Sequence, residues 1–204
     1  ENCNKIIKTY NYITALSSIY ENDTEKDSSS YLIVGSENNH IFIINPSENK
    51  IISKGKLPGT PFIILSDGIY SGEHKIIVAD RYCNIYILKK TKIEKKIILS
   101  HPIVSMLYSD NRIYLGTISK QYISLKENGS LEFSIVQPNI ITCMELAKRE
   151  NGEILILIAT KDSELRIYDK KKLCYILQIG DNIFGMKFGK LGIKEDCLIL
   201  CTYN

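Results

Sequence analysis

The residues best suited to redox or metal chemistry are six cysteines, and their spacing disfavours both. They stand at Cys3, Cys83, Cys143, Cys174, Cys197 and Cys201, so only the last two are close in sequence. On a strand, Cys197 and Cys201 would share one face about 13 Å apart, beyond the reach of a disulfide or a shared metal. The sequence therefore predicts reduced, mostly buried thiols and a cytosolic compartment.

Three histidines could bind metal or transfer protons, but they fall at unrelated places in the chain. His40 is expected in a turn, His74 at the start of a strand, and His101 directly before Pro102. No cysteine or histidine lies at zinc-binding spacing from any of them. We expect solvated or loop histidines and no metal site.

Paired carboxylates, which could supply general acid–base catalysis, occur as Asp67 with Glu73 and as Glu195 with Asp196. Both pairs fall in stretches that resemble polar loops, where carboxylates serve solvation. The sequence has no serine nucleophile elbow, phosphate-binding loop or dinucleotide fingerprint. We therefore expect no catalysis, no cofactor and no small-molecule substrate.

The overall charge favours no strongly charged partner. The chain of 204 residues has 26 basic and 23 acidic side chains, a net charge of +3. That field is too weak to predict nucleic acid or an anionic membrane as the main partner. A hydrophobic content of 44% is ample for a folded domain.

Short strands are the elements that must position these residues. Apolar runs rich in Ile, Val and Tyr alternate with turn residues, and helix signals are nearly absent. A small residue ends such a run at four places, which we call the anchor residues: Gly35, Ala79, Gly116 and Ala159. Six residues after each anchor, a second apolar run holds Ile41, Ile85, Tyr122 and Leu165. The anchors lie 44, 37 and 43 residues apart, close to the period of about 40–50 residues that is typical of propeller blades.

Each repeat also has an opening and a closing strand, which predicts blades of four antiparallel strands. Opening strands are expected at 13–19, 62–65, 103–107 and 140–146, and closing strands at 51–52, 97–99, 131–136 and 173–177. The predicted fold class is all-β, a β-propeller fragment with blades at 13–57, 61–99, 102–136 and 140–179 and a partial blade at 183–204. We expect the missing blades elsewhere in the native chain or in a partner. Ile43, Ile87 and Ile167 are expected to be buried between sheets.

Propeller geometry divides the turns between two faces. The turns between third and fourth strands carry Lys89, Lys90, Lys92, Lys95 and Lys96 against Glu94, and Lys170, Lys171 and Lys172 against Asp169. We interpret them as a solvated rim, with a docking patch for an acidic protein or lipid surface as the alternative. On the opposite face, Tyr82 beside Arg81 is the best candidate for partner binding, because Arg and Tyr dominate interface hot spots.

An enzyme built on a propeller would place its site at the central channel, where the opening strands converge. Those strands bring mainly apolar and hydroxyl side chains, and Glu145 is the only acid expected within one. The sequence therefore favours a binding surface over an active site.

Three stretches carry a resemblance to a known family. They are 32–38 with 43–46, then 84–90, then 164–168 followed by 188–192 and Glu195–Asp196. In order and spacing they resemble the N-terminal propeller of the Bardet–Biedl syndrome protein one family, although the chain has no tryptophan and so lacks the signature of ordinary WD-repeat propellers.

The resemblance implies a non-catalytic subunit of the BBSome, a coat-like complex. Its propeller would bind a GTP-loaded Arf-like small GTPase and other BBSome subunits, and would associate with membranes indirectly. The protein would serve the traffic of ciliary membrane proteins and would be located in the cytoplasm, at the basal body and in the cilium. In the family the GTPase contact involves the first and last blades. The resemblance therefore places at most its edge here, near residues 183–204, and assigns no single contact residue. The alternative is a generic propeller scaffold of another coat or intraflagellar-transport complex without GTPase recognition.

Overall fold

The computed structural model describes residues 12–22, 29–149, 152–190 and 196–203. All regular structure in these ranges is β-strand, and no α-helix occurs among them. None of the described residues forms a helix long and apolar enough to cross a membrane. The chain divides into two compact units at residues 100 and 101, which we call unit 1 and unit 2.

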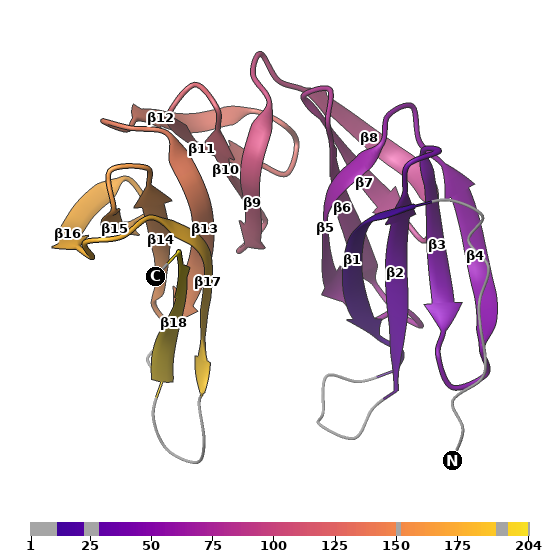
Figure 1. The fold of residues 1–204 in the computed structure, drawn as a ribbon. Coiled ribbons are helices and arrows are strands. Elements are labelled where there is room, and N and C mark those ends of the chain that lie inside the picture. Colours follow the sequence, from indigo (N-terminus) through magenta and orange to yellow (C-terminus); the bar gives the residue numbers. More distant parts are fainter. Residues whose placement is uncertain (1–11, 23–28, 150–151, 191–195, 204) are drawn as a thin grey trace. The chain divides into compact units, whose positions relative to one another are not determined.

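Unit 1 contains two antiparallel sheets of four strands, each in sequence order (Figure 1). The first sheet consists of β1 (Ile13–Tyr20), β2 (Ser30–Ser36), β3 (His40–Asn45) and β4 (Lys50–Lys56). The second consists of β5 (Pro61–Gly68), β6 (His74–Asp80), β7 (Asn84–Lys89) and β8 (Lys92–Ile98).

Unit 2 repeats this plan twice and adds a two-stranded sheet. Its complete sheets consist of β9 (Ile103–Ser109), β10 (Arg112–Thr117), β11 (Gln121–Lys126) and β12 (Leu131–Val136), and of β13 (Ile141–Lys148), β14 (Ile154–Thr160), β15 (Glu164–Asp169) and β16 (Lys172–Gln178). The two-stranded sheet consists of β17 (Ile183–Lys190) and β18 (Asp196–Thr202).

The register of the central strands confirms the repeat that the sequence shows. Each anchor pairs directly with the residue six positions on: Gly35 with Ile41, Ala79 with Ile85, Gly116 with Tyr122, and Ala159 with Leu165. The all-β fold of four-stranded antiparallel blades is therefore confirmed. Several strands are longer than predicted, and β5 includes Pro61, whose missing N–H is tolerated because it is the first residue of the strand.

Close packing between neighbouring blades explains why the anchors are small. A Cβ atom added to Gly35 would lie 2.6 Å from the Cβ atom of Pro61, and one added to Gly116 would lie 2.9 Å from Ile141. In both cases the neighbour opens the next blade of the same unit. Any larger side chain would force these sheets apart.

The core of each unit lies between its sheets. In unit 1, Ile33, Ile41, Ile43, Ile64 and Ile76 belong to one buried cluster that both sheets share. The predicted burial holds for Ile43 and Ile87. Ile167 is only partly buried, packed against the cluster that joins β13–β15 to β17 and β18.

Candidate interaction surfaces

The cysteines that the structure describes are all free, as predicted, but less buried than expected. Cys83, Cys143, Cys174 and Cys197 are partly buried, and Cys201 is exposed. Cys3 lies outside the described residues. Burial raises the pKa of the Cys143 thiol from 9.0 to about 11, which makes it a poor nucleophile at neutral pH. The described residues contain no group of three or more His, Cys, Asp or Glu side chains that could hold a metal ion.

His74 contradicts the prediction of solvated histidines. Its side chain is buried and stacks near the Tyr70 ring, with 5.2 Å between ring centroids. Its Nε2 accepts a hydrogen bond of 3.0 Å from the backbone N–H of Lys90, and its Nδ1 lies 3.2 Å from the carbonyl oxygen of Gly72. His74 therefore supports the turn between β7 and β8 from beneath, a role that depends on a residue 16 positions away.

The candidate carboxylates are scattered and do not form a catalytic pair. Asp67 and Asp196 lie on β5 and β18, contrary to the loop placement predicted for them, and both are exposed. Glu195 lies outside the described residues. Glu145 is not the only acid on an opening strand, since Asp67 also lies on one. Glu145 forms an ion pair of 3.0 Å with Lys187 on β17.

A buried polar residue directly follows each anchor, a feature that the sequence interpretation missed. Ser36, Asp80, Thr117 and Thr160 each end a second strand, and each is buried. Each side chain forms a hydrogen bond to the turn that follows. The last residue of each turn has a positive φ of 64–66°: Asn39, Cys83, Lys120 and Ser163. The recurrence of a polar residue at one repeat position was the signal that could have revealed this turn support.

Asp80 supports the turn that carries the predicted binding residues. Its Oδ1 accepts hydrogen bonds from the backbone N–H groups of Tyr82 at 2.7 Å and Asn84 at 2.9 Å. Its Oδ2 accepts from the Asn84 side-chain amide and from the Tyr86 hydroxyl, each at 2.8 Å. Because the carboxylate fixes the turn from inside, Arg81 is held facing solvent and Tyr82 is 70% exposed.

Hydrogen bonds connect this turn to the corresponding turn of the neighbouring blade in unit 1. The backbone N–H of Arg81 donates to the carbonyl oxygen of Thr60, and the Thr60 hydroxyl donates to Asn39 at 2.8 Å. On the other side of that turn, the N–H of Glu37 donates to Tyr12, whose side chain is exposed. Two exposed tyrosines and Arg81 thus lie on one connected surface, the composition that protein contact sites favour.

The lysines predicted to lie in turns lie largely on strands. Only Lys90 and Thr91 separate β7 from β8, whereas Lys92, Lys95 and Lys96 belong to β8. Lys172 likewise begins β16. The hairpins are tighter than expected because Lys90 and Lys170 adopt positive φ values of 56° and 51°, which allow a two-residue connection.

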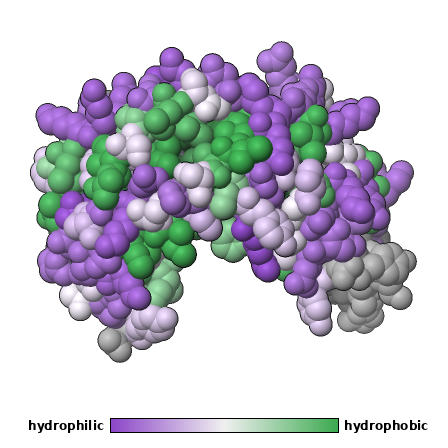
Figure 2. Space-filling model, turned by 90° about the horizontal axis from the view of Figure 1, so that it is seen from above, coloured by the Kyte–Doolittle hydropathy of each residue, from purple (hydrophilic) through white to green (hydrophobic). Residues whose placement is uncertain are grey.

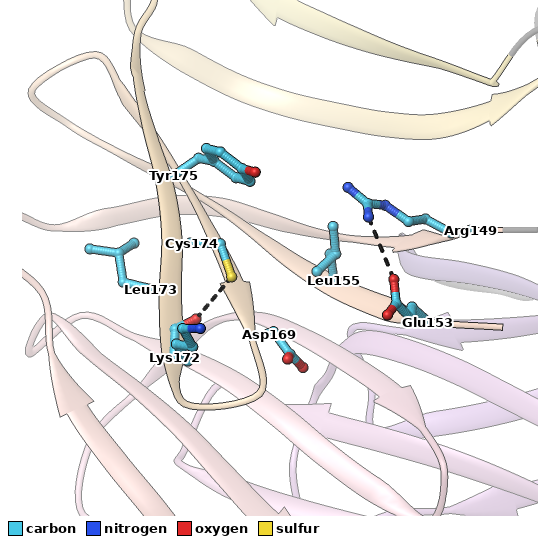
Figure 3. A pocket seen from close by; sticks show the side chains of 8 residues that line it. All are labelled: Arg149, Glu153, Leu155, Asp169, Lys172, Leu173, Cys174 and Tyr175. Atoms are coloured by element: carbon cyan, nitrogen blue, oxygen red, sulfur yellow. Dashed lines mark hydrogen bonds and ion pairs between the residues drawn. The ribbon is translucent and has the colours of Figure 1, made fainter. Parts of the chain in front are cut away.

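Unit 2 has a shallow pocket of about 360 Å³ beside the β15–β16 hairpin (Figure 3). Arg149 and Glu153 form an ion pair of 3.5 Å on one side of it, and Tyr175 lies on the other. The remaining lining comes from Leu155, Asp169 and residues 172–174. Opposite charges alternate around the pocket, so it attracts neither anions nor cations strongly.

Large hydrophobic side chains are exposed on both units, and Figure 2 shows hydrophobic patches among hydrophilic side chains on one face. β16 exposes Leu173, Tyr175, Ile176 and Leu177. On the two-stranded sheet, Phe184 packs edge-on against Tyr203, with 3.8 Å between ring centroids, and Tyr203 is 75% exposed. Exposed apolar side chains gathered on one strand are candidates for a protein interaction site.

Comparison with known proteins agrees with the architecture. A family model described as ciliary BBSome complex subunit 1 matches residues 1–89. The curated proteins named BBSome complex member BBS1 from Mus musculus and Homo sapiens are each 26% identical, over 97% and 96% of this chain. The chain spans about a third of their length, 34% in both cases.

Solved structures show the same fold. A crystal structure of BBS1N in complex with ARL6DN matches 100% of this chain and 63% of its own, with a TM-score of 0.89 and 22% identity. A second crystal of that complex matches 97% of this chain and 64% of its own, at a TM-score of 0.88 and 20% identity. The structure of the Saccharomyces cerevisiae protein Sqt1 matches 93% of this chain and 56% of its own chain, with a TM-score of 0.72 and 10% identity.

These matches identify the sheets as blades of a β-propeller. The relatives named for the BBSome match nearly the whole chain, and the family model matches residues 1–89. In sequence and in fold, the chain is therefore similar to the ciliary BBSome complex subunit 1 family.

Proposed function

We propose that this chain is a propeller segment of a non-catalytic BBSome subunit that binds a GTP-loaded Arf-like small GTPase and supports the traffic of ciliary membrane proteins. The observation that carries the proposal is the similarity of the whole chain, at a TM-score of 0.89, to a BBS1 domain crystallised with ARL6DN. Ciliary and basal-body localisation, with indirect membrane association, follows from the same proposal.

A binding role suits the described surfaces better than catalysis does. Asp67 lies in unit 1, Glu145 in unit 2 is paired with Lys187, and His74 supports a turn. The exposed tyrosines and apolar strands, in contrast, present rigid contact area on well-supported turns. Interfaces depend on such aromatic anchors, which lose little conformational entropy on binding.

Two exposed aromatic groups are the contact sites we assign to this function. Phe184 on β17 and Tyr203 directly after β18 are assigned to the GTPase, because the family resemblance marks residues 183–204 as the edge of its contact. Arg81 and Tyr82 are assigned to another BBSome subunit, because they lie on the separate turn surface of unit 1.

The test is retention of purified Arf-like GTPase by the immobilised full-length protein, with the GTPase loaded in parallel with a non-hydrolysable GTP analogue and with GDP. We expect retention only in the GTP state. Tyr203→Ala should weaken it by at least about tenfold, as expected when a hot-spot aromatic is truncated. Tyr175→Ala, which removes another exposed tyrosine of unit 2, is the matched control and should have no effect.

Equal retention in both nucleotide states, or none in either, would contradict the proposal. That result would favour the generic scaffold role. Arg81→Ala with Tyr82→Ala should leave GTPase binding intact and weaken co-purification of the other BBSome subunits. Loss of GTPase binding in this double variant would show that the two contact sites are wrongly assigned.

A further inference from the structure

The outermost strands of unit 1 carry an excess of lysine that the proposed function does not use. Residues 46–56 and 89–96 hold eight lysines and two acids, Glu48 and Glu94. None of these lysines forms an ion pair with a described acid. The equivalent residues of unit 2, 127–136 and 169–176, hold only three lysines, Lys170, Lys171 and Lys172, and three acids, Glu127, Glu132 and Asp169. The excess of positive charge therefore lies on the blades of unit 1.

Part of this charge surrounds a hollow of about 450 Å³ between the two blades of unit 1, which we call the lysine hollow. Its lining is Ser53 of β4 together with Lys89, Lys90, Thr91, Lys92, Ile93 and Glu94 of the β7–β8 hairpin. The Ser53 and Thr91 hydroxyls are hydrogen-bonded to each other at 2.8 Å. Three lysine residues and two hydroxyl-bearing residues thus line one concave site, and their side chains include the donors that a phosphate group requires.

The hairpin that carries these lysines is fixed in place. The Lys90 N–H donates to the buried ring of His74, as described above. On the other side, Gly55 of β4 allows the carbonyl of Thr91 to approach so closely that an added Cβ atom would collide with it. The site is therefore largely formed before a ligand arrives, which lowers the entropy lost on binding.

We propose that the lysine hollow binds the phosphorylated headgroup of an anionic membrane lipid, so that unit 1 contacts the membrane directly. This contact goes beyond the proposed function, in which membrane association is indirect. The hollow and the strands beside it supply the chemistry of both parts of the lipid surface. The lysines would attract the charged headgroups. Beside the lysines lie three exposed isoleucines, Ile51, Ile52 and Ile93, whose apolar side chains suit the boundary between headgroups and acyl chains.

Two features favour a membrane over a phosphorylated peptide. All eight cations are lysines, which act as flexible point charges, whereas phosphopeptide sites rely on the planar bidentate fork of arginine. The lysines also continue beyond the hollow along β4 and β8. Seven-residue strands are about 20 Å long, so the charge covers several headgroups and not one phosphate.

The experiment is co-sedimentation of the full-length protein, without GTPase, with vesicles of phosphatidylcholine alone, with added phosphatidylserine, and with added phosphatidylinositol bisphosphate. We expect no binding to the neutral vesicles and the strongest binding to the phosphoinositide vesicles. The test variant is Lys89→Gln, Lys90→Gln and Lys92→Gln combined. The matched control is Lys170→Gln, Lys171→Gln and Lys172→Gln, in the equivalent β15–β16 hairpin of unit 2.

The test variant should lower the partition coefficient about a hundredfold, since each lysine near an anionic surface contributes about fivefold. The control should bind as the unmodified protein does. A Lys-to-Arg variant at the same three positions should retain binding, which separates lost charge from lost fold. Three results would overturn the proposal. They are an equal loss of vesicle binding in the test and control variants, undiminished vesicle binding in the test variant, and capture of phosphopeptides without any vesicle binding.

Discussion

Replacement of Asp80 by alanine should be among the most destabilising single changes in unit 1. Asp80 is 1% exposed and accepts four hydrogen bonds within one tight turn. Asp80→Ala removes the acceptor for two backbone N–H groups and leaves the hydroxyl of Tyr86, a fully buried side chain, without its partner.

The magnitude follows from the groups that lose their partner. A buried donor left unsatisfied costs about 1–3 kcal/mol, and each backbone hydrogen bond to the carboxylate contributes about 1 kcal/mol once water replaces it. The sum is about 3–5 kcal/mol, a large share of the about 5–15 kcal/mol that holds a typical domain folded. Asp80→Asn keeps the oxygen that accepts from both backbone N–H groups, but its NH2 group would face the NH2 group of Asn84. This variant should therefore lower the free energy of unfolding by about 1–2 kcal/mol.

Urea unfolding followed by far-ultraviolet circular dichroism measures these losses, since the chain has no tryptophan for fluorescence. Combining Asp80→Ala with Tyr86→Phe removes the unpaired hydroxyl. The double variant should lose at least about 1 kcal/mol less free energy of unfolding than the sum of the two single losses. A loss below about 1 kcal/mol for Asp80→Ala, or strict additivity in the double variant, would refute the assignment of Asp80 as the support of this turn.

Three further predictions follow from burial and close contact. Gly59→Ala should destabilise unit 1 by about 2 kcal/mol in the same assay, because the added Cβ atom would collide with the fixed Asp80 carboxylate. An unchanged midpoint of urea unfolding would show that this carboxylate moves freely. Ile43→Asp should prevent folding, seen as loss of the sheet signal in circular dichroism, because it buries an unpaired charge in the core. At pH 8, Cys143 should react with iodoacetamide about a hundredfold more slowly than an ordinary thiol, since its pKa is raised from 9.0 to about 11. The stability that this raised pKa contributes should be complete below pH 9 and lost as the pH rises through 11. Rapid labelling at pH 8 would contradict the raised pKa on which both statements depend.

The strand plan was predictable because it depends on neighbours close in the sequence. Alternating apolar residues and two- or three-residue turns set the strands, and the constant offset from Gly35 to Ile41 and from Ala79 to Ile85 gave the correct pairing register. The small anchors were visible as a repeat, although their cause, close contact with the next blade, was not.

Residues whose role depends on distant partners were misplaced for the same physical reason. His74 was predicted at the start of a strand but solvated, since nothing adjacent in sequence shows that Lys90 needs an acceptor. The lysines of the β7–β8 hairpin were predicted to lie in a rim of turns. The two-residue turn and the contact of Thr91 with Ser53, 38 positions away, place three of them, Lys89, Lys90 and Lys92, in the lining of a hollow.

The sequence by itself determined the blades and their order, because hydrophobic alternation, turn length and repeat spacing are properties of neighbouring residues. Only the tertiary structure decided which polar groups are buried supports and which face solvent. Asp80 and Glu94 are both acids beside lysine- or arginine-containing turns, yet one is enclosed by four donors and the other lines an open hollow. Burial depends on what packs against a side chain from other strands, and that is fixed only when the sheets come together.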